Sequence, residues 1–442
     1  MGIGGAGMHI RYGERCVYRY CTPPKQVQIF KSEHWLTFRY LSFHSAINIF
    51  ATFSSLVGPV IGGSLTDYLS WRWTFYVNVP LVIIAGCVVY FHLNIPKPQG
   101  SLIEKLKRID YVGSTLALGF SILLLLGLNW GGFEYTWSSP QVVSCLTLAV
   151  VFVVLLIFWE IKQAIEPLIP MGLFRNRTLM SVFSLNVFFG MVFYQVGWFC
   201  PYYFQVVRGD DATTSGLRTL PAVIIGMIVS FGNGWLISHL NSYRPFLWCG
   251  ASVLLVNAGL LSMLDETSSW GLVYTLVTLN SCAVNIMVGA TIIAVQAAAD
   301  NSSVAIVTGL CSFFRIMGGA IGLATGGAVL NNSLLAILPS LIPTELVTKS
   351  IQSVEFVRMG LMPDIQAKAV HGYVLALRNV WLECTTMAGI SLGLSMFVQH
   401  YSLRRKATTT VGKKAEVPAP GDVVELEIDA KEVTNEKVEQ KE

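Results

Sequence analysis

The sequence predicts an all-α integral membrane protein, and three observations support this prediction. Hydrophobic residues make up 53% of the 442 residues and charged residues only 13%, whereas soluble proteins carry about 25% charged residues. The mean hydropathy is +0.58. The apolar residues form long runs without the alternation that a membrane β-barrel requires. The formal net charge of +4 is too small to indicate a nucleic-acid partner.

Ten segments are long and apolar enough to cross a bilayer, which takes about 20 residues in a helix. Several tryptophans lie near their predicted ends, among them Trp71, Trp73 and Trp130, as an interfacial aromatic belt requires. The first segment has the weakest pattern of the ten. In chain order the predicted spans are 43–66, 73–95, 110–130, 139–161, 179–204, 217–240, 245–264, 270–297, 304–330 and 371–400.

The orientation follows from the basic residues of the short loops. Loops 96–109 and 162–178 carry several Lys and Arg residues, and more basic residues follow the last span. The intervening loops 131–138 and 265–269 carry none. Because basic loops stay in the cytoplasm, both termini are predicted to be cytoplasmic.

Two segments do not have the composition of a span. Residues 331–370 mix aliphatic residues with prolines and charges, which predicts short amphipathic helices outside the membrane. Asn331 opens an N-glycosylation sequon there. Residues 401–442 are charged and contain Pro and Gly, which predicts a disordered cytoplasmic tail.

Two charged residues lie deep within predicted spans. Arg315 is near the middle of 304–330, and Glu383 is about 12 residues into the last span. A charge at this depth costs roughly 2.5–3.5 kcal/mol on insertion scales, so it tends to have a partner or a function. The two could form a structural ion pair between helices, or each could face a watery cavity on a substrate or proton pathway.

Amide side chains are also frequent in the spans. Each alone is more often interhelical packing than a ligand contact, but together they suit a polar central cavity, with Asn186, Gln195 and Asn285 as pathway candidates. The full set is Asn186, Gln195, Asn233, Asn257, Asn280, Asn285 and Gln296. An aromatic wall for an apolar substrate is a second possibility, formed by Tyr194, Trp198, Tyr202, Tyr203 and Phe204.

Small residues predict two sites of close helix packing. Gly318, Gly322 and Gly326 recur every four residues and so lie on one face of a helix. The stretch that begins at Gly58 has the same spacing, and Pro59 bends a helix there by removing a hydrogen bond. The glycines of this stretch are Gly58, Gly62 and Gly63.

This stretch resembles a known family signature. Gly58, Pro59, Gly62 and Gly63 are similar to the antiporter motif of the major facilitator superfamily, in particular of its fungal 14-spanner drug:proton antiporters. The segment that follows in this family is matched by Trp71, Arg72, Trp73, Asn78 and Pro80. Residues 166–177, 202–221 and 313–322 also resemble family segments, so the resemblance covers about residues 43–400.

The resemblance implies a major facilitator fold with two six-helix bundles and two extra helices between them. It leads us to expect about ten of 14 transmembrane helices, because the acidic motif of the first family helix and the Gly-Asp-Arg motif after the second are not found. Residues 2–7 resemble the end of the fourth helix, whereas 8–20 and 32–40 do not fit the pattern. We therefore expect an N-terminally truncated sequence whose assigned start lies too far downstream.

The expected domains follow from this alignment. They are the remnant of the fourth helix and a cytoplasmic loop (1–42), the last two helices of the N-terminal bundle (43–109), two central extra helices (110–161), the C-terminal six-helix bundle with its external loop 331–370 (162–400), and the tail (401–442).

The main functional hypothesis is a monomeric, proton-coupled efflux transporter of the plasma membrane. By the resemblance, it exports small organic molecules (drugs, toxins or secondary metabolites, as in multidrug resistance or mycotoxin export) by alternating access. Its partners are then the substrate, protons and the lipid bilayer. One alternative is a siderophore or metabolite carrier of the same fold, and another is a nonfunctional or regulatory membrane fragment. No enzyme motif, metal-ligand cluster or cofactor site is predicted.

Overall fold

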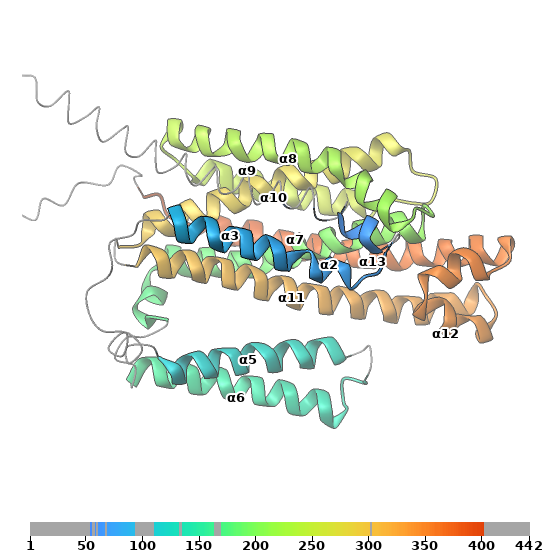
Figure 1. Ribbon diagram of the computed structural model, residues 1–442, viewed down its shortest axis with the longest axis horizontal. Coiled ribbons are helices and arrows are strands. Elements are labelled where there is room, and N and C mark those ends of the chain that lie inside the picture. Colours follow the sequence, from blue (N-terminus) through green and yellow to red (C-terminus); the bar gives the residue numbers. More distant parts are fainter. Residues whose placement is uncertain are drawn as a thin grey trace, which may run out of the picture. The chain divides into compact units, whose positions relative to one another are not determined.

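The computed structural model is almost entirely helical. It describes residues 54, 58, 61–66, 69–92, 110–131, 135–162, 169–300 and 303–401. Within these residues the only β-structure is an isolated bridge between Gly131 and Tyr135. The elements (Figure 1) are α2 (Trp73–Tyr76), α3 (Asn78–His92), α5 (Tyr111–Trp130), α6 (Pro140–Lys162), η1 (Met171–Arg175), α7 (Arg177–Val206), α8 (Ala212–Leu240), α9 (Arg244–Leu261), α10 (Trp270–Ala298), α11 (Val304–Ile337), η2 (Leu338–Ser340), α12 (Thr344–Gln352), η3 (Phe356–Gly360) and α13 (Pro363–Met396).

The predicted spans from 110–130 to 270–297 each coincide with one helix, and 73–95 corresponds to α2 and α3. Eight segments of the described chain are long and apolar enough to cross a membrane. The predicted span 43–66 lies mostly outside the described residues. The chain is thus a multi-pass membrane protein with an all-α fold.

The last predicted span differs from the expectation. It is the 34-residue helix α13, which is long enough to span but is not among the eight segments apolar enough to do so by composition. Arg378, Asn379 and Glu383 lie near its middle and lower its hydropathy. Because α13 packs against α7, α9 and α11, protein rather than lipid surrounds much of its surface.

The segment 331–370 is shorter as a loop than predicted. Helix α11 continues to Ile337, and α13 begins at Pro363. Packing explains the difference, because Leu334 and Ala369 in these extensions are buried in the core although the surrounding residues are not continuously apolar. Between them, α12 is a short amphipathic helix, as predicted, with Val347 buried and Glu345 exposed.

Side-chain caps fix several helix starts. The Asn176 side chain accepts hydrogen bonds from the backbone N–H of Thr178 and Leu179 at the start of α7. Asp211 caps α8 and Ser269 caps α10 in the same way. Each satisfies a backbone donor that the first helical turn leaves unpaired, so a polar residue before an apolar run sets the boundary.

Helix α7 is central to the core of the C-terminal helices. It packs most extensively against α11 and α13 and also against α10, while α8 and α9 pack on α10. Its large apolar side chains Phe183, Phe189 and Phe204 are almost completely buried. A helix that is buried on most of its circumference holds its polar side chains at defined positions inside the bundle.

Glycines let α7 and α11 approach closely. A Cβ atom at Gly318 would overlap the carbonyl oxygen of Val187 in α7, and one at Gly322 would lie 2.6 Å from the Cα of Met191. From the other side, a Cβ at Gly190 would overlap the carbonyl oxygen of Arg315. The two backbones are therefore in direct contact at this crossing, which only residues without a side chain permit.

Candidate functional site

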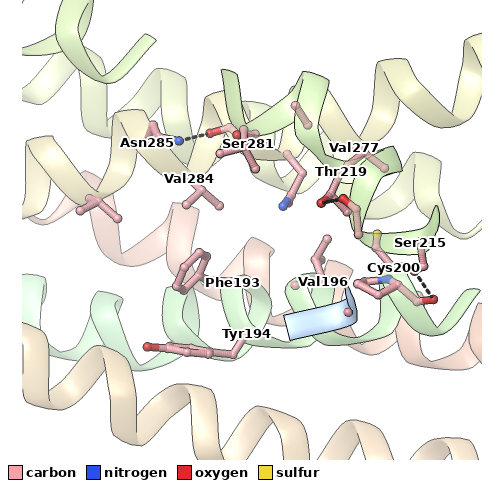
Figure 2. A pocket seen from close by; sticks show the side chains of 18 of the residues that line it. Phe193, Tyr194, Val196, Cys200, Ser215, Thr219, Val277, Ser281, Val284 and Asn285 are labelled. Atoms are coloured by element: carbon pink, nitrogen blue, oxygen red, sulfur yellow. Dashed lines mark hydrogen bonds between the residues drawn. The ribbon is translucent and has the colours of Figure 1, made fainter. Parts of the chain in front are cut away.

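A cavity of about 600 Å³ opens among the C-terminal helices. Helices α7, α8 and α10 supply most of its wall, and α11 contributes Arg315. Figure 2 shows Phe193, Val196 and Cys200 of α7 facing Val277 and Val284 of α10 across the space, with Ser215 and Thr219 of α8 at one end. This volume is within the range of small-molecule sites, about 300–1,000 Å³.

The cavity wall combines apolar surface with isolated polar groups. Phe193 and Tyr194 form an edge-to-face pair with ring centroids 4.8 Å apart, and valines supply much of the remaining surface. Besides Arg315 and Tyr194, the polar side chains are amides and hydroxyls, namely Gln205, Ser215, Thr219, Ser230, Asn280, Ser281 and Asn285. Such a surface can bind an apolar body and orient a few polar groups on it.

Among the described residues of the cavity wall, only Arg315 carries a formal charge. It is half-buried, and its Nη1 atom is fully covered and has no hydrogen-bond partner. Arg315 is a candidate from the sequence because it lies near the middle of a predicted span. The structure places it at the cavity through the α7–α11 crossing, where its backbone lies against Gly190.

The alternative of an ion pair between Arg315 and Glu383 is wrong. In the described part of the chain the ion pairs are Arg218–Asp210 and His371–Glu266. Glu383 lies instead next to Thr325 and Gln195. The two helices α11 and α13 turn the charged side chains toward different neighbours, which the sequence spacing alone does not determine.

Gln195 joins three helices. Its side chain is completely buried, donates to the carbonyl of Gly322 (2.5 Å) and accepts a hydrogen bond from the Cys384 thiol (2.7 Å). A Cβ at Gly326 would lie 2.9 Å from the Gln195 Nε2 atom. Gln195 therefore connects α7 to α11 and α13 beside Glu383 and does not line the cavity.

The other two amide candidates separate in the structure. Asn285 lines the cavity, and its Nδ2 donates to the carbonyl of Ser281 at 2.9 Å (Figure 2). Asn186 is completely buried and donates to the carbonyl of Val182 (2.8 Å) and to the Cys311 sulfur (3.4 Å). Its contacts join α7 to α11, which is a packing role.

Of the aromatic residues predicted from the sequence, Tyr194 lines the cavity. Phe193 also lines it but was not predicted. Trp198 is 65% exposed, while Tyr203 and Phe204 are buried in the core. Thr219 and Ser281 were also not predicted, because an isolated hydroxyl in an apolar helix usually bonds its own backbone. Only the packing of the four helices shows that these residues line the cavity, unlike other hydroxyl residues in the spans.

The structure describes the three glycines of the family signature but not Pro59. Gly63 lines the cavity, and a Cβ there would lie 3.1 Å from the Cα of Thr213 at the start of α8. A Cβ at Gly58 or Gly62 would meet nothing within 4 Å, and Pro59 lies outside the described residues.

The segment that follows in the signature is described in full from Trp71 to Pro80. Trp71 and Trp73 are exposed, and Arg72 stacks over the Trp71 ring. Asn78 donates a hydrogen bond to the carbonyl of Thr74, and Pro80 lies in the first turn of α3.

Asn331 of the sequon and Gly326 both lie in helix α11. Asn331 lies in the last two turns of α11 and not in a loop, and Gly326 lies one turn beyond Gly322 on the same helix. The glycosylation of Asn331 is thus a prediction about a helical residue, and it stays a prediction.

The sequence did not predict a cluster of charged side chains that joins the loop after α7 to the loop before α10. Arg218 pairs with Asp210 and stacks on Trp270 at 3.7 Å from the ring centroid, and Arg208 stacks on the same ring at 4.5 Å. Arg208 also donates to the backbone carbonyl of Glu266. This cluster ties the α7–α8 loop to the α9–α10 loop.

Two carboxylates order the same loops. Hydrogen bonds from Ser268 and Thr267 lower the pKa of Asp265 below its ordinary value. The hydrogen bond from Thr214 does the same for the pKa of Asp211. Both carboxylates therefore stabilise their loops in the ionised form, and this contribution is lost only as the pH falls through these lowered values.

The helices and the cavity together define the class of protein: a multi-pass helical membrane protein with an internal cavity of small-molecule size. The sequence profile of the Major Facilitator Superfamily matches residues 39–323. The chain belongs to the Major Facilitator Superfamily.

Curated relatives are fungal transporters. The chain is 28% identical over 371 residues to MFS transporter L2 of Phoma sp., which covers 82% of this chain and 62% of that protein. It is 29% identical to the MFS-type efflux transporter phmH of Phaeosphaeria nodorum (87% and 71% covered) and 30% identical to the efflux pump aunC of Aspergillus niger (77% and 62% covered). The chain thus spans less than two thirds of the length of two of these three relatives.

Proposed function

We propose that this chain takes part in proton-coupled efflux of small organic molecules by alternating access. The observation that carries the proposal is the cavity of about 600 Å³ inside a bundle of membrane-spanning helices. The names of the relatives, an efflux transporter and an efflux pump, support the direction of transport. We place the chain in the plasma membrane as a monomer with both termini in the cytoplasm, and we propose no enzymatic activity.

The residues have distinct roles in this proposal. The cavity residues bind substrate, with Arg315 and Asn285 among them. Gly63 supports a contact that moves when the cavity changes its accessible side, since it lies against the start of α8. Glu383 exchanges the coupling proton, because it is a carboxylate near the middle of a bundle helix with one oxygen lacking a partner.

The test is transport by the purified chain in vesicles under an imposed pH gradient. Three fluorescent probes share one aromatic body and differ in charge: dansylglycine (anion), its methyl ester (neutral) and dansylcadaverine (cation). We expect gradient-driven movement of at least one probe. Movement of none of them would overturn the proposal and favour the alternative of a membrane fragment without transport activity.

Replacing Glu383 tests the coupling. We expect Glu383→Gln to lower gradient-driven transport by about tenfold or more, because the neutral amide cannot take up and release a proton. The matched control is Glu345→Gln, since Glu345 is an exposed residue of α12. Equal transport by the Glu383→Gln variant and the parent chain would show that Glu383 is not the coupling group.

A further inference from the structure

Arg315 has a guanidinium group without a counter-ion. In the described part of the chain its side chain makes no ion pair, and its covered Nη1 has no hydrogen-bond acceptor. Other arginines at the bundle have partners: Arg218 pairs with Asp210, and Arg358 donates to the carbonyl of Asp210. Because a desolvated charge without a partner is unfavourable, the position of Arg315 leaves an interaction to be made.

The surroundings favour an anion at this point. The described wall of the cavity contains no Asp or Glu, so its formal charge is positive. Side chains with N–H or O–H groups, such as Gln205, Asn280 and Ser281, add further hydrogen-bond donors. In a low-dielectric site a charge-assisted hydrogen bond to a carboxylate is favourable, whereas a cation would be repelled.

The rest of the wall determines the kind of anion. Phe193, Tyr194 and the valines of α7 and α10 offer a surface for an aromatic or aliphatic body (Figure 2). One charged residue calls for one ligand charge and not for a polyanion such as a nucleotide. The ligand is therefore amphiphilic, with one acidic group at one end.

We propose that the cavity binds monovalent organic anions, namely carboxylic acids with an apolar body, whose carboxylate pairs with the Arg315 guanidinium. This proposal rests on the proposed function only for the statement that these molecules are also the transported substrates. The binding itself follows from the charge of the cavity.

The experiment measures binding of the three dansyl probes to the full chain in lipid nanodiscs, with empty nanodiscs as background. We expect dansylglycine to bind about tenfold tighter than its methyl ester and dansylcadaverine to bind most weakly. Arg315→Gln is expected to abolish the preference for the acid while leaving the affinity for the ester unchanged. Arg315→Lys is expected to keep part of the preference, because it keeps the charge but not the bidentate geometry.

Arg378→Gln is the matched control. Arg378 is exposed on α13 and does not line the cavity, so the same loss of charge there should leave all three affinities unchanged. Equal binding of acid and ester to the parent chain would overturn the proposal. A loss of affinity for all probes in Arg315→Gln would also do so, since it would show that Arg315 only holds the wall in place.

The outcomes separate this proposal from the proposed function. Gradient-driven transport of the ester without preferential binding of the acid leaves the function standing and removes the anion site. Preferential binding of the acid without movement of any probe keeps the anion site and removes the function.

Discussion

Gly318→Ala is expected to lower the free energy of unfolding by about 3 kcal/mol, at the upper end of the usual cost of overpacking. The added Cβ would overlap the carbonyl oxygen of Val187, which is backbone and cannot rotate away. Helices α7 and α11 must then separate, which loses packing along their whole contact. The measurement is thermal unfolding of the purified chain in detergent, followed by loss of the monodisperse peak in size-exclusion chromatography.

Gly327→Ala is the control within the same helix. A Cβ at Gly327 meets nothing within 4 Å, and alanine is the better helix former by about 1 kcal/mol. We therefore expect this variant to be as stable as the parent chain or slightly more stable. Equal thermal stability of Gly318→Ala and Gly327→Ala would contradict the close crossing of α7 and α11.

Arg218→Gln is expected to destabilise the fold by about 3 kcal/mol, because it leaves a mostly buried carboxylate unpaired. The Asp210 side chain is only 9% exposed. Arg218 Nη2 donates to Asp210 Oδ1 at 2.9 Å, and its guanidinium stacks on Trp270. The loss should therefore loosen the α7–α8 loop and the α9–α10 loop together, which hydrogen exchange on residues 207–211 and 262–269 would detect.

The control for this prediction is again Arg378→Gln, which removes an exposed charge from α13. Faster exchange in both loops for Arg218→Gln and in neither loop for Arg378→Gln is the expected pattern. Unchanged exchange in the Arg218→Gln variant would mean that the ion pair does not hold the loops.

Helix positions could largely be predicted from the sequence where lipid is the main neighbour. The spans 110–130 and 139–161 match α5 and α6 within one residue at each end, because continuous apolar runs define them. The start of α13 was missed by eight residues, since Pro363 begins a stretch whose burial depends on packing against other helices. Hydropathy does not register such contacts.

The site could be predicted only in part. Arg315 and Asn285 were candidates because polar groups are costly inside a membrane, and both lie at the cavity. Gln195 met the same criterion but connects three helices instead. Which face of a helix meets a cavity depends on its rotation against its neighbours, and nothing in the local sequence around Gln195 or Thr219 reports that rotation.

We propose that the cavity among α7, α8, α10 and α11 is the substrate site. Thr219→Trp fills this cavity, whereas Thr275→Trp places the same side chain at an exposed position of α10. The measurement is gradient-driven transport of the dansyl probes by both variants in vesicles. We expect Thr219→Trp to lower transport by about tenfold or more, equivalent to at least about 1.4 kcal/mol, and Thr275→Trp to transport like the parent chain. Equal transport by the two variants would show that substrate does not bind in this cavity.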